Sequence, residues 1–472
     1  MAEGMVSHED RVRGETLRNV AERYLCELAN RYMVQVEIDE FSISNKFKSC
    51  RLHDLMRDLC LSKGKDEEFL EVIDGHMGTE DASLIYKTSR LAIHLDRVED
   101  DYLGKNKKLQ SLLLLKVGYR RRVLNNLVSI NLRTLKFLKI LILEGYNFEN
   151  KQFPEEIKEL ILLKHLSIQY SKIEELPSSV CNLPCLQLLN LDVYGRLGMP
   201  NTIYKLRRLK HLDLPRLQRV IGGKLKLEGL NELETLNWFN SRIHDTTHLI
   251  KLSKLQRLRA LIYDDESLRM IVDHILKHQD QFRETRLSIG EGMTLENDSS
   301  TLLMKILRIN SLSYLGILVR VGKLPAYELE LWQSIVTLFL HGCYIEEDPM
   351  EILEKLPMLR ELTLWPNSYV GREMVCQESG FSKLRNLSLM NFGNLEEWRV
   401  EERAMPSLSY LEIWGCEKLK MIPEGLKFIT TLKRLKIHEM PEEFKDKARV
   451  VDGEEGEDYH KIKHIPFIDI SW

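Results

Sequence analysis

A six-residue pattern, apolar-x-x-apolar-x-apolar, recurs along most of this 472-residue chain and constrains its fold more than any other feature. The copies lie mostly about 20 to 29 residues apart, which is the period of leucine-rich repeats. Clear copies begin at Leu163, Leu186, Leu209, Leu359, Leu384, Leu408 and Leu432. Weaker copies begin at Thr88, Leu109, Leu138, Leu233, Leu255, Glu284, Leu312 and Ile335. The sequence therefore predicts about fifteen repeating units.

Prolines occupy a constant place in four of these units. Each stands nine residues before the next copy of the pattern, where its fixed φ suits the start of a returning arm. An aliphatic residue follows three positions later. The proline and aliphatic pairs are Pro154 and Ile157, Pro177 and Val180, Pro200 and Ile203, and Pro423 and Leu426.

Each unit is predicted to be a short strand, a tight bend and an irregular or helical return. Cys343 and Cys416 fall three residues past the last strand aliphatic of their units, where a small side chain can meet turn backbone groups. One unit cannot cover its own leucines, but stacking on the next unit buries them. We expect an α/β leucine-rich-repeat solenoid with a parallel sheet on its concave face. A globular α/β domain rich in leucine would not produce the constant proline offset.

The N-terminal region has a different pattern. Apolar residues at helical spacing over 15–32 predict a packed helix, and residues 33–52 resemble a hairpin with a polar turn at Ser42 to Asn45. A second helix is expected from Asp54, as N-cap, to about Lys63. We expect a partial winged-helix domain over 1–80, the solenoid over 81–445, and an acidic loop with a C-terminal cap over 446–472.

Charge argues against nucleic-acid binding. The whole chain has a formal charge of -3, and residues 1–75 carry 11 basic and 16 acidic side chains (11 − 16 = −5), which would repel phosphate. By contrast, residues 101–145 carry ten basic and two acidic side chains (10 − 2 = +8), including Arg120, Arg121 and Arg122. Two roles are open for these arginines. They form an interdomain site on which the acidic N-terminal region docks, or they form a solvated run of charges.

Composition points to a cytoplasmic protein that is not an enzyme. No apolar run approaches the roughly 20 residues of a membrane span, and no signal-peptide core is present near the first residue. The eight cysteines include no CxxC pair, which favours a reducing compartment, and no metal site or cofactor is expected. His274 and His278 share a helical face but lack the glutamate of HExxH, so a solvated helix face is the favoured interpretation.

Partner binding is expected on the strand positions between the leucines, because those side chains project from the concave sheet. Aromatic residues are common anchors of protein interfaces. Packing against adjacent repeats is the alternative role for each of them. The aromatic candidates at or just beyond these positions are Tyr170, Phe239, Phe339, Trp365, Tyr410 and Trp414, with Trp365, Tyr410 and Trp414 as the preferred site.

Several segments resemble the plant intracellular nucleotide-binding leucine-rich-repeat disease resistance proteins of the coiled-coil type. They are MAEGMV, AERYLCELANRYMVQV, KSCRLHDLMRDLCLSKGKDEEFL and GEDYHKIKHIP, so the resemblance covers essentially the whole chain. LHDLMRDLC is similar to the Met-His-Asp signature of the family's winged helix, with Leu52 in place of methionine. The resemblance implies that His53 and Asp54 belong to a nucleotide-sensing motif, in which the histidine approaches the β-phosphate of ADP in the full-length family.

The chain departs from this family in two important respects. It contains no GxxxxGK[ST], the loop that cradles the phosphates of ADP or ATP, and no coiled-coil segment. We therefore expect a truncated receptor or a fragmentary gene product. As the resemblance implies, its repeats recognise a pathogen effector or a guarded host protein. The alternative is a stand-alone leucine-rich-repeat adaptor, such as the substrate-recognition subunit of a ubiquitin ligase.

Overall fold

The computed structural model describes residues 6, 9–12, 17–38, 47–74, 88–94, 106–115, 127–128, 131–148, 151–291, 293, 299–325, 332–451 and 453–471. The chain divides into two compact units. Unit 1 comprises residues 1–39 and 46–258, and unit 2 comprises residues 40–45 and 259–472. The strand β15 (Arg257–Ile262) spans the boundary between them.

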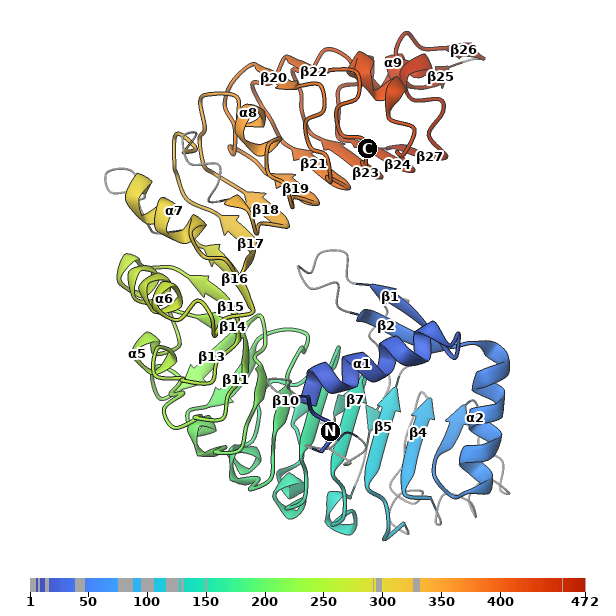
Figure 1. Cartoon of the computed structure of the whole chain (residues 1–472), viewed down its shortest axis with the longest axis vertical. Coiled ribbons are helices and arrows are strands. Elements are labelled where there is room, and N and C mark those ends of the chain that lie inside the picture. Colours follow the sequence, from blue (N-terminus) through green and yellow to red (C-terminus); the bar gives the residue numbers. More distant parts are fainter. Residues whose placement is uncertain are drawn as a thin grey trace. The chain divides into compact units, whose positions relative to one another are not determined.

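A parallel sheet forms the inner face of unit 1 (Figure 1). Its strands follow one another in chain order, each beside the next. They are β3 (Glu71–Asp74), β4 (Arg90–His94), β5 (Ser111–Leu115), β7 (Ile140–Glu144), β9 (His165–Gln169), β10 (Leu188–Asn190), β12 (His211–Asp213) and β14 (Thr235–Asn240). Because β3 already belongs to this sheet, the sheet begins before residue 81, the start that the sequence had suggested.

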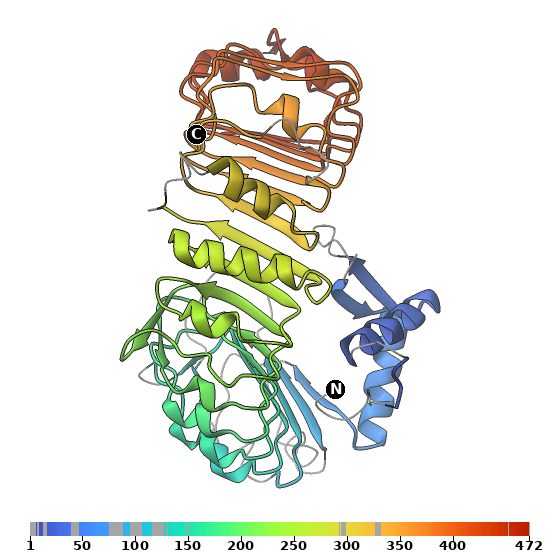
Figure 2. The same cartoon turned by 60° about the vertical axis from the view of Figure 1, so that its left-hand side comes forward.

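Unit 2 has a parallel sheet of the same kind (Figures 1 and 2). Its strands also pair in chain order. They are β16 (Glu284–Ile289), β17 (Leu312–Ile317), β18 (Thr337–Leu340), β19 (Glu361–Leu364), β21 (Asn386–Met390), β23 (Tyr410–Trp414), β24 (Arg434–His438) and β27 (Phe467–Ser471). Each of the fifteen units predicted from the sequence contains one of the sheet strands from β4 to β24, so the predicted repeat is confirmed.

Short helices and minor strands form the outer layer of the repeats. The α-helices are α5 (Thr246–Leu249), α6 (Asp265–Lys277), α7 (Ser299–Leu307), α8 (Met350–Leu353) and α9 (Glu442–Ala448). The 3₁₀ turns are η1 (Leu132–Thr134), η3 (Glu155–Glu159), η4 (Ser178–Asn182), η5 (Ile203–Lys205), η7 (Glu424–Phe428) and η8 (Tyr459–Lys461). The minor strand pairs are β6 (Leu127–Val128) with β8 (Asn147–Phe148), β11 (Leu197–Pro200) with β13 (Gln218–Ile221), β20 (Glu373–Cys376) with β22 (Glu397–Val400), and β25 (Val450–Val451) with β26 (Glu454–Glu455).

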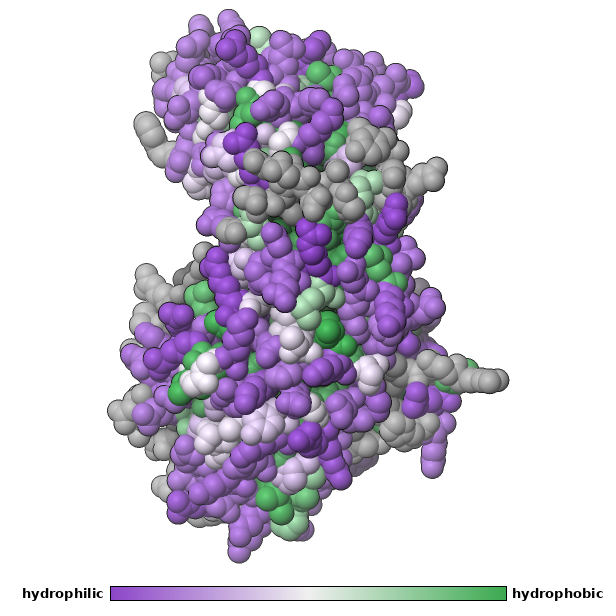
Figure 3. Space-filling model, turned by 90° about the vertical axis from the view of Figure 1, so that its left-hand side faces the viewer, coloured by the Kyte–Doolittle hydropathy of each residue, from purple (hydrophilic) through white to green (hydrophobic). Residues whose placement is uncertain are grey.

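The core lies between these layers and consists of leucines in register. Leu362, Leu387 and Leu411 occupy the same level of three neighbouring strands and are fully buried. Each such side chain stabilises the fold by roughly 1.5–3 kcal/mol relative to exposure. The face of unit 2 that carries α6 and α7 is by contrast largely hydrophilic, with hydrophobic residues scattered over it (Figure 3).

The returning arms begin where the prolines predicted. Pro154, Pro177 and Pro423 are the N-caps of η3, η4 and η7, whereas Pro200 ends β11 just before η5. The aliphatic residues three positions later are all fully buried, and they are Ile157, Val180, Ile203 and Leu426. The bend cysteines also behave as expected. The Cys343 thiol is buried and donates a hydrogen bond to the Ile317 carbonyl at 3.4 Å.

The N-terminal elements contain the predicted hairpin. Helix α1 (Leu17–Asn30) precedes the antiparallel strands β1 (Val34–Ile38) and β2 (Phe47–Leu52), and α2 (Asp54–Asp66) lies next to β3 (Figures 1 and 2). The predicted N-cap is wrong by one residue, because His53 has the extended cap conformation and Asp54 lies in the first helical turn. The predicted packed stripe of α1 is only partly buried. Val20 is fully buried, while Tyr32 just beyond the helix is 88% exposed.

The C-terminal segment completes unit 2. Its residues Ile462 and Ile465 are buried, and β27 pairs with β24 as the last described strand of the sheet. In the part of the chain that the structure describes, no helix has the length and apolar character needed to cross a membrane.

Candidate protein-binding surface

The register of the strands arranges the outward side chains of unit 2 in three rows that run across the sheet. The first row contains Thr337, Glu361, Asn386, Tyr410, Arg434 and Phe467. The second row contains Phe339, Thr363, Ser388, Glu412, Lys436 and Asp469. The third row follows the last inward aliphatic of each strand and contains His341, Trp365, Met390, Trp414, His438 and Ser471.

The rings of Phe339 and His341 both lie against the ring of Trp365. We call these three residues the Trp365 patch. The Trp365 ring centroid lies 5.1 Å from that of Phe339 and 5.7 Å from that of His341, both in edge-to-face geometry. Such contacts stabilise an aromatic pair by about 0.5–1.5 kcal/mol beyond burial alone. Trp365 nevertheless remains 40% exposed. The patch therefore presents a large apolar ring whose orientation is fixed before any partner arrives.

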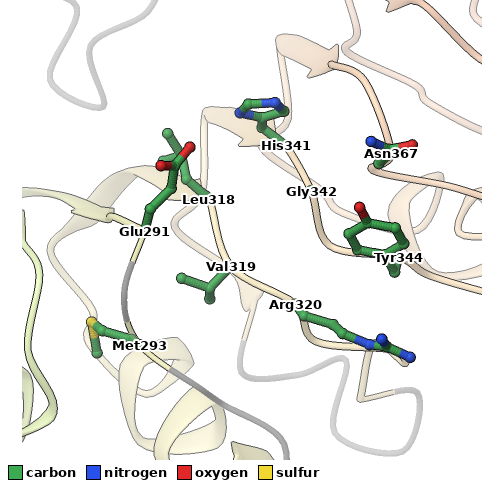
Figure 4. A pocket seen from close by; sticks show the side chains of 9 residues that line it. All are labelled: Glu291, Met293, Leu318, Val319, Arg320, His341, Gly342, Tyr344 and Asn367. Carbon is green, nitrogen blue, oxygen red and sulfur yellow. The ribbon is translucent and has the colours of Figure 1, made fainter.

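A pocket of about 350 Å³ adjoins this patch and shares His341 with it. Its lining consists of Glu291, Met293, Leu318, Val319, Arg320, His341, Gly342, Tyr344 and Asn367 (Figure 4). The chain bends sharply here, since Gly342, Tyr344 and Asn367 have φ of 62°, 51° and 56°. The Arg320 guanidinium lies 5.5 Å from the Tyr344 ring. With carboxylate, guanidinium, phenol and aliphatic groups together, the pocket has the size and mixed polarity to accept a partner's side chain.

A second pair of rings lies further along the third row. Trp414 lies 5.4 Å from His438, and the His438 imidazole lies 3.3 Å from the Asp469 carboxylate. Met390 separates Trp365 from Trp414 in the row, so their backbones are about 10 Å apart at the usual strand spacing. A protein–protein interface of standard area is therefore wide enough to include both tryptophans.

Tyr410 stands apart from these rings. It lies in the first row, four residues before Trp414 and thus about 13 Å away along the strand. Its ring packs under the guanidinium of Arg434 at 5.3 Å and near the ammonium of Lys436 at 5.9 Å. Burial, with the negative charge of Glu412, raises the pKa of Tyr410 to about 12, so the phenol stays a hydrogen-bond donor at neutral pH. The structure thus separates Tyr410 from Trp365 and Trp414 instead of gathering the three in one cluster.

Two aromatic candidates belong to unit 1. Tyr170 is 44% exposed and lies 6.1 Å from Tyr194. The outward position predicted for Phe239 is wrong, because its ring is fully buried against His244 at 5.2 Å. Trp238 has φ of 64°, which breaks the alternation of β14 and turns Phe239 inward. Trp238 takes the less buried position and lies 4.8 Å from the Arg216 guanidinium.

His53 and Asp54 lie where β2 ends and α2 begins. His53 is exposed, and the 85%-exposed Asp54 carboxylate pairs with Arg57 at 3.6 Å. The nucleotide-sensing role that the resemblance implies for these two residues remains a prediction. Arg120, Arg121 and Arg122 lie outside the described residues, and their predicted interdomain role remains a prediction.

The described residues hold no group of three metal-ligating side chains. Burial raises the pKa of the Cys343 thiol to about 12 and that of Cys416 to about 11, so both are protonated core thiols. The His274 ring on α6 lies 4.8 Å from the ring of His278, the residue just after this helix, and burial lowers the pKa of His274. The two thiols therefore belong to the packing of the repeats, whereas His274 is partly buried and His278 is exposed.

Sequence reasoning missed the pocket beside the Trp365 patch. Its main polar residues, Glu291, Arg320 and Tyr344, come from three successive bends that follow β16, β17 and β18. Bend residues show no common spacing along the chain. The one available signal was Gly342 just before Cys343, which marks a turn with positive φ but not a pocket.

Comparison with known proteins identifies both regions of the chain. A leucine-rich repeat region family matches residues 121–452, and a disease resistance protein winged helix domain family matches residues 1–60. A putative disease resistance protein of Arabidopsis thaliana is 36% identical over 480 residues, covering 100% of this chain and 49% of that protein. The disease resistance protein RPP8 of the same plant is 34% identical over 458 residues, covering 96% of this chain and 49% of RPP8.

The chain thus spans about half the length of these relatives. The matches support the resemblance to disease resistance receptors and not the alternative of a ubiquitin-ligase adaptor.

Proposed function

Because the chain belongs to the leucine-rich-repeat disease resistance proteins of plants, we propose that unit 2 recognises a protein partner in plant immunity. The partner is a pathogen effector or a host protein that an effector modifies. It binds the three outward rows of the sheet, with Trp365 as the principal anchor and Trp414 as the second. We further propose that the chain acts in the cytoplasm by binding and not by catalysis.

The observation that carries this proposal is the half-exposed ring of Trp365, held edge-on by Phe339 and His341. A rigid aromatic ring loses little conformational freedom on binding, which is why tryptophan is frequent among interface hot spots. The parallel sheet below is fixed by a continuous ladder of hydrogen bonds and by buried leucines. The surface is therefore pre-organised for a partner of matching shape.

The polar neighbours add specificity. Glu361, Glu412 and Asp469 alternate with Arg434 and Lys436 on the same sheet, so acidic and basic groups are interspersed. Such mixed surfaces select partners by complementary charge and exclude partners that place like charges opposite. We expect the partner to insert an apolar side chain into the pocket. Its charged groups should lie opposite groups of the other sign in the three rows.

Proximity labelling in leaf tissue exposed to a pathogen tests this proposal. The chain, fused to a biotin ligase, is compared with a Trp365→Ala, Trp414→Ala double variant and with a Phe137→Ala control. Phe137 is 57% exposed in unit 1 and belongs to none of the three rows. The proposal predicts proteins labelled by wild type and control but not by the double variant. Identical labelling by all three chains would exclude this surface as the recognition site.

A further inference from the structure

The last described strand of the unit 2 sheet, β27, has a free edge. It pairs with β24 over all five of its residues, and no other described strand pairs with it (Figure 1). The Phe467 amide donates to the carbonyl of Lys433, just before β24, at 3.1 Å. Because alternate residues of a strand bond to opposite sides, the peptide groups of Ile468 and Ile470 face away from β24. No hydrogen bond to these groups is found within the described residues.

This edge strand is accessible along its whole length. Phe467 is 52% exposed, and each of the other four residues of β27 is partly exposed. The contrast with β24 is clearest at the core positions. Leu435 and Ile437 of β24 are fully buried, whereas Ile468 and Ile470, which pair with them, are only partly buried. The core of unit 2 is therefore incompletely covered at this edge.

A protected edge in the same unit shows what β27 lacks. On the minor strand β20, the Val375 amide donates to the Asp348 carboxylate at 2.8 Å, and the Gln377 amide donates to the Glu354 carboxylate at 2.9 Å. Protection of edge groups, by charged side chains or by proline, prevents pairing with other chains. β27 contains neither lysine nor proline, and no side chain caps its outer amides within the described residues. Its edge therefore remains open to another strand.

The second outward row indicates the charge that an added strand should carry. Across β23, β24 and β27 this row contains Glu412, Lys436 and Asp469, so acidic and basic side chains alternate from strand to strand. Opposite charges stabilise facing positions of neighbouring strands, and like charges destabilise them. The Asp469 side chain is 38% exposed. A strand that pairs with β27 should therefore place a lysine or arginine opposite Asp469.

A second copy of the chain does not meet this requirement. Because β27 has a single free edge, two copies can pair there only around a two-fold axis, with their strands antiparallel. Full pairing of the five residues then centres on the third, which places Asp469 of one copy opposite Asp469 of the other. Like charges in directly facing positions destabilise such a pair. The edge therefore favours a strand from a different protein.

We propose that the free edge of β27 binds an extended segment of a partner protein in which one lysine or arginine stands between two aliphatic residues. The backbone of the segment pairs with Ile468 and Ile470. Its aliphatic side chains cover the same two residues, and its cation lies opposite Asp469. Strand addition of this kind draws affinity from main-chain hydrogen bonds and specificity from alternate side chains. The site is separate from the Trp365 patch, because β27 is the fourth strand after β19 in the sheet.

The test uses the full chain and an array of peptides in which a central lysine or arginine is flanked by each pair of aliphatic residues. The tightest binder is then measured by fluorescence polarisation at physiological salt. Three altered probes accompany it, one with glutamate in place of the cation and two with one or the other alternate set of backbone amides N-methylated. We expect the glutamate probe and one N-methylated probe to bind at least about tenfold more weakly than the parent peptide, which is a difference of about 1.4 kcal/mol.

A matched pair of variants locates the site. Ile470→Pro and Ile470→Ala both remove part of the same side chain, but only proline removes the amide that faces away from β24. We expect Ile470→Pro to bind the parent peptide at least about tenfold more weakly than Ile470→Ala does. Asp469→Asn should reduce the advantage of the parent peptide over the glutamate probe. Asp280→Asn, the same change at an exposed residue elsewhere in unit 2, should not reduce it.

Trp365→Ala should leave peptide binding unchanged, which separates this site from the surface proposed above. The inference is overturned if no array peptide binds, if both N-methylated probes bind as tightly as the parent, or if Ile470→Pro and Ile470→Ala bind it equally. A concentration-dependent dimer that Ile470→Pro abolishes would assign the edge to a second copy of the chain and would overturn the inference as well.

Discussion

The Lys461 ammonium lies 2.7 Å from the Asp458 carboxylate, with both side chains buried at the end of unit 2. Each also bonds to the peptide groups of Ile422, so the pair fastens the segment that precedes β27 to the preceding repeat. Removing one partner of a buried ion pair leaves the other charge buried and unpaired, which costs about 3–5 kcal/mol. We expect Lys461→Met to destabilise the C-terminal segment by this amount.

Hydrogen exchange of β27 amides and urea unfolding measure this effect. Lys463→Met is the matched control, because its partner Glu455 and Lys463 itself are each 52% exposed and such pairs contribute at most about 1 kcal/mol. Adding Asp458→Leu to Lys461→Met should recover part of the loss, since no charge is then left unpaired. Equal protection of β27 in all variants would contradict the role given to the pair.

Acid should destabilise unit 1 through His244. Burial, with a smaller contribution from Lys224, lowers the pKa of His244 to about 3, and its Nδ1 accepts the Asn240 amide at 2.9 Å. The unfolded histidine titrates near 6.5, so the unfolded state binds more protons below that pH. The stabilisation is complete above pH 6.5 and is lost as pH falls toward 3, by up to about 1.4 kcal/mol per pH unit.

Urea denaturation between pH 7.5 and 5 measures this dependence. His244→Asn retains an acceptor for the Asn240 amide but cannot titrate, so the slope of unfolding free energy against pH should decrease by about one proton. Leu217→Asn, at a 64%-exposed residue of unit 1 that does not titrate, should keep the wild-type slope. An unchanged slope in His244→Asn would show that this histidine is accessible to protons in the folded chain.

A methyl group at Gly425 should destabilise unit 2. Its Cβ would lie 2.0 Å from the Val400 carbonyl oxygen, so the backbone must shift, at about 1–3 kcal/mol for overpacking of this kind. Gly393→Ala is the control, because no heavy atom lies within 4 Å of a Cβ there. We expect the melting temperature to fall for Gly425→Ala and to stay or rise slightly for Gly393→Ala. Similar melting temperatures would mean that the close contact is not present.

The inverted side chains of β14 allow a direct comparison of the sequence prediction with the structure. Phe239→Ala should cost about 3–5 kcal/mol, as expected for a buried phenylalanine. Trp238→Ala should cost much less, because the ring is only partly buried and its cation–π contact with Arg216 contributes about 0.5–1 kcal/mol. Equilibrium unfolding of the two variants decides the matter. A larger loss of stability for Trp238→Ala than for Phe239→Ala would support the outward position that the sequence pattern predicted for Phe239.

The architecture was predictable because its determinants are local and repeated. Leucines must be buried at a fixed period, and the φ of Pro154 or Pro177 is restricted wherever proline occurs. The inward position of the Phe239 ring was not predictable, because the residue type of Trp238 does not indicate a positive φ. The burial of Lys461 was not predictable either. Lysine is rarely buried without a partner, and the contacts of Lys461 with its partners form only in the folded chain.

The candidate surface was predictable in part for a similar reason. Strand periodicity places Trp365 outward, but not its contacts with Phe339 and His341 or the adjoining pocket, which depend on how successive bends stack. Likewise, the spacing of Tyr410 and Trp414 along one strand excludes the compact cluster suggested by their similar chemistry. Residue type indicates which side chains can bind, and register decides which of them act together.

The central claim is that Trp365 anchors a protein partner on the sheet of unit 2. Its most direct test is the dissociation constant of a purified partner for the wild-type chain, for Trp365→Ala and for the control Phe137→Ala, measured by biolayer interferometry. We expect at least a roughly 30-fold loss of affinity for Trp365→Ala, equivalent to a hot spot of about 2 kcal/mol, and less than about a threefold change for the control. A partner that binds Trp365→Ala as tightly as wild type would rule out this role of Trp365.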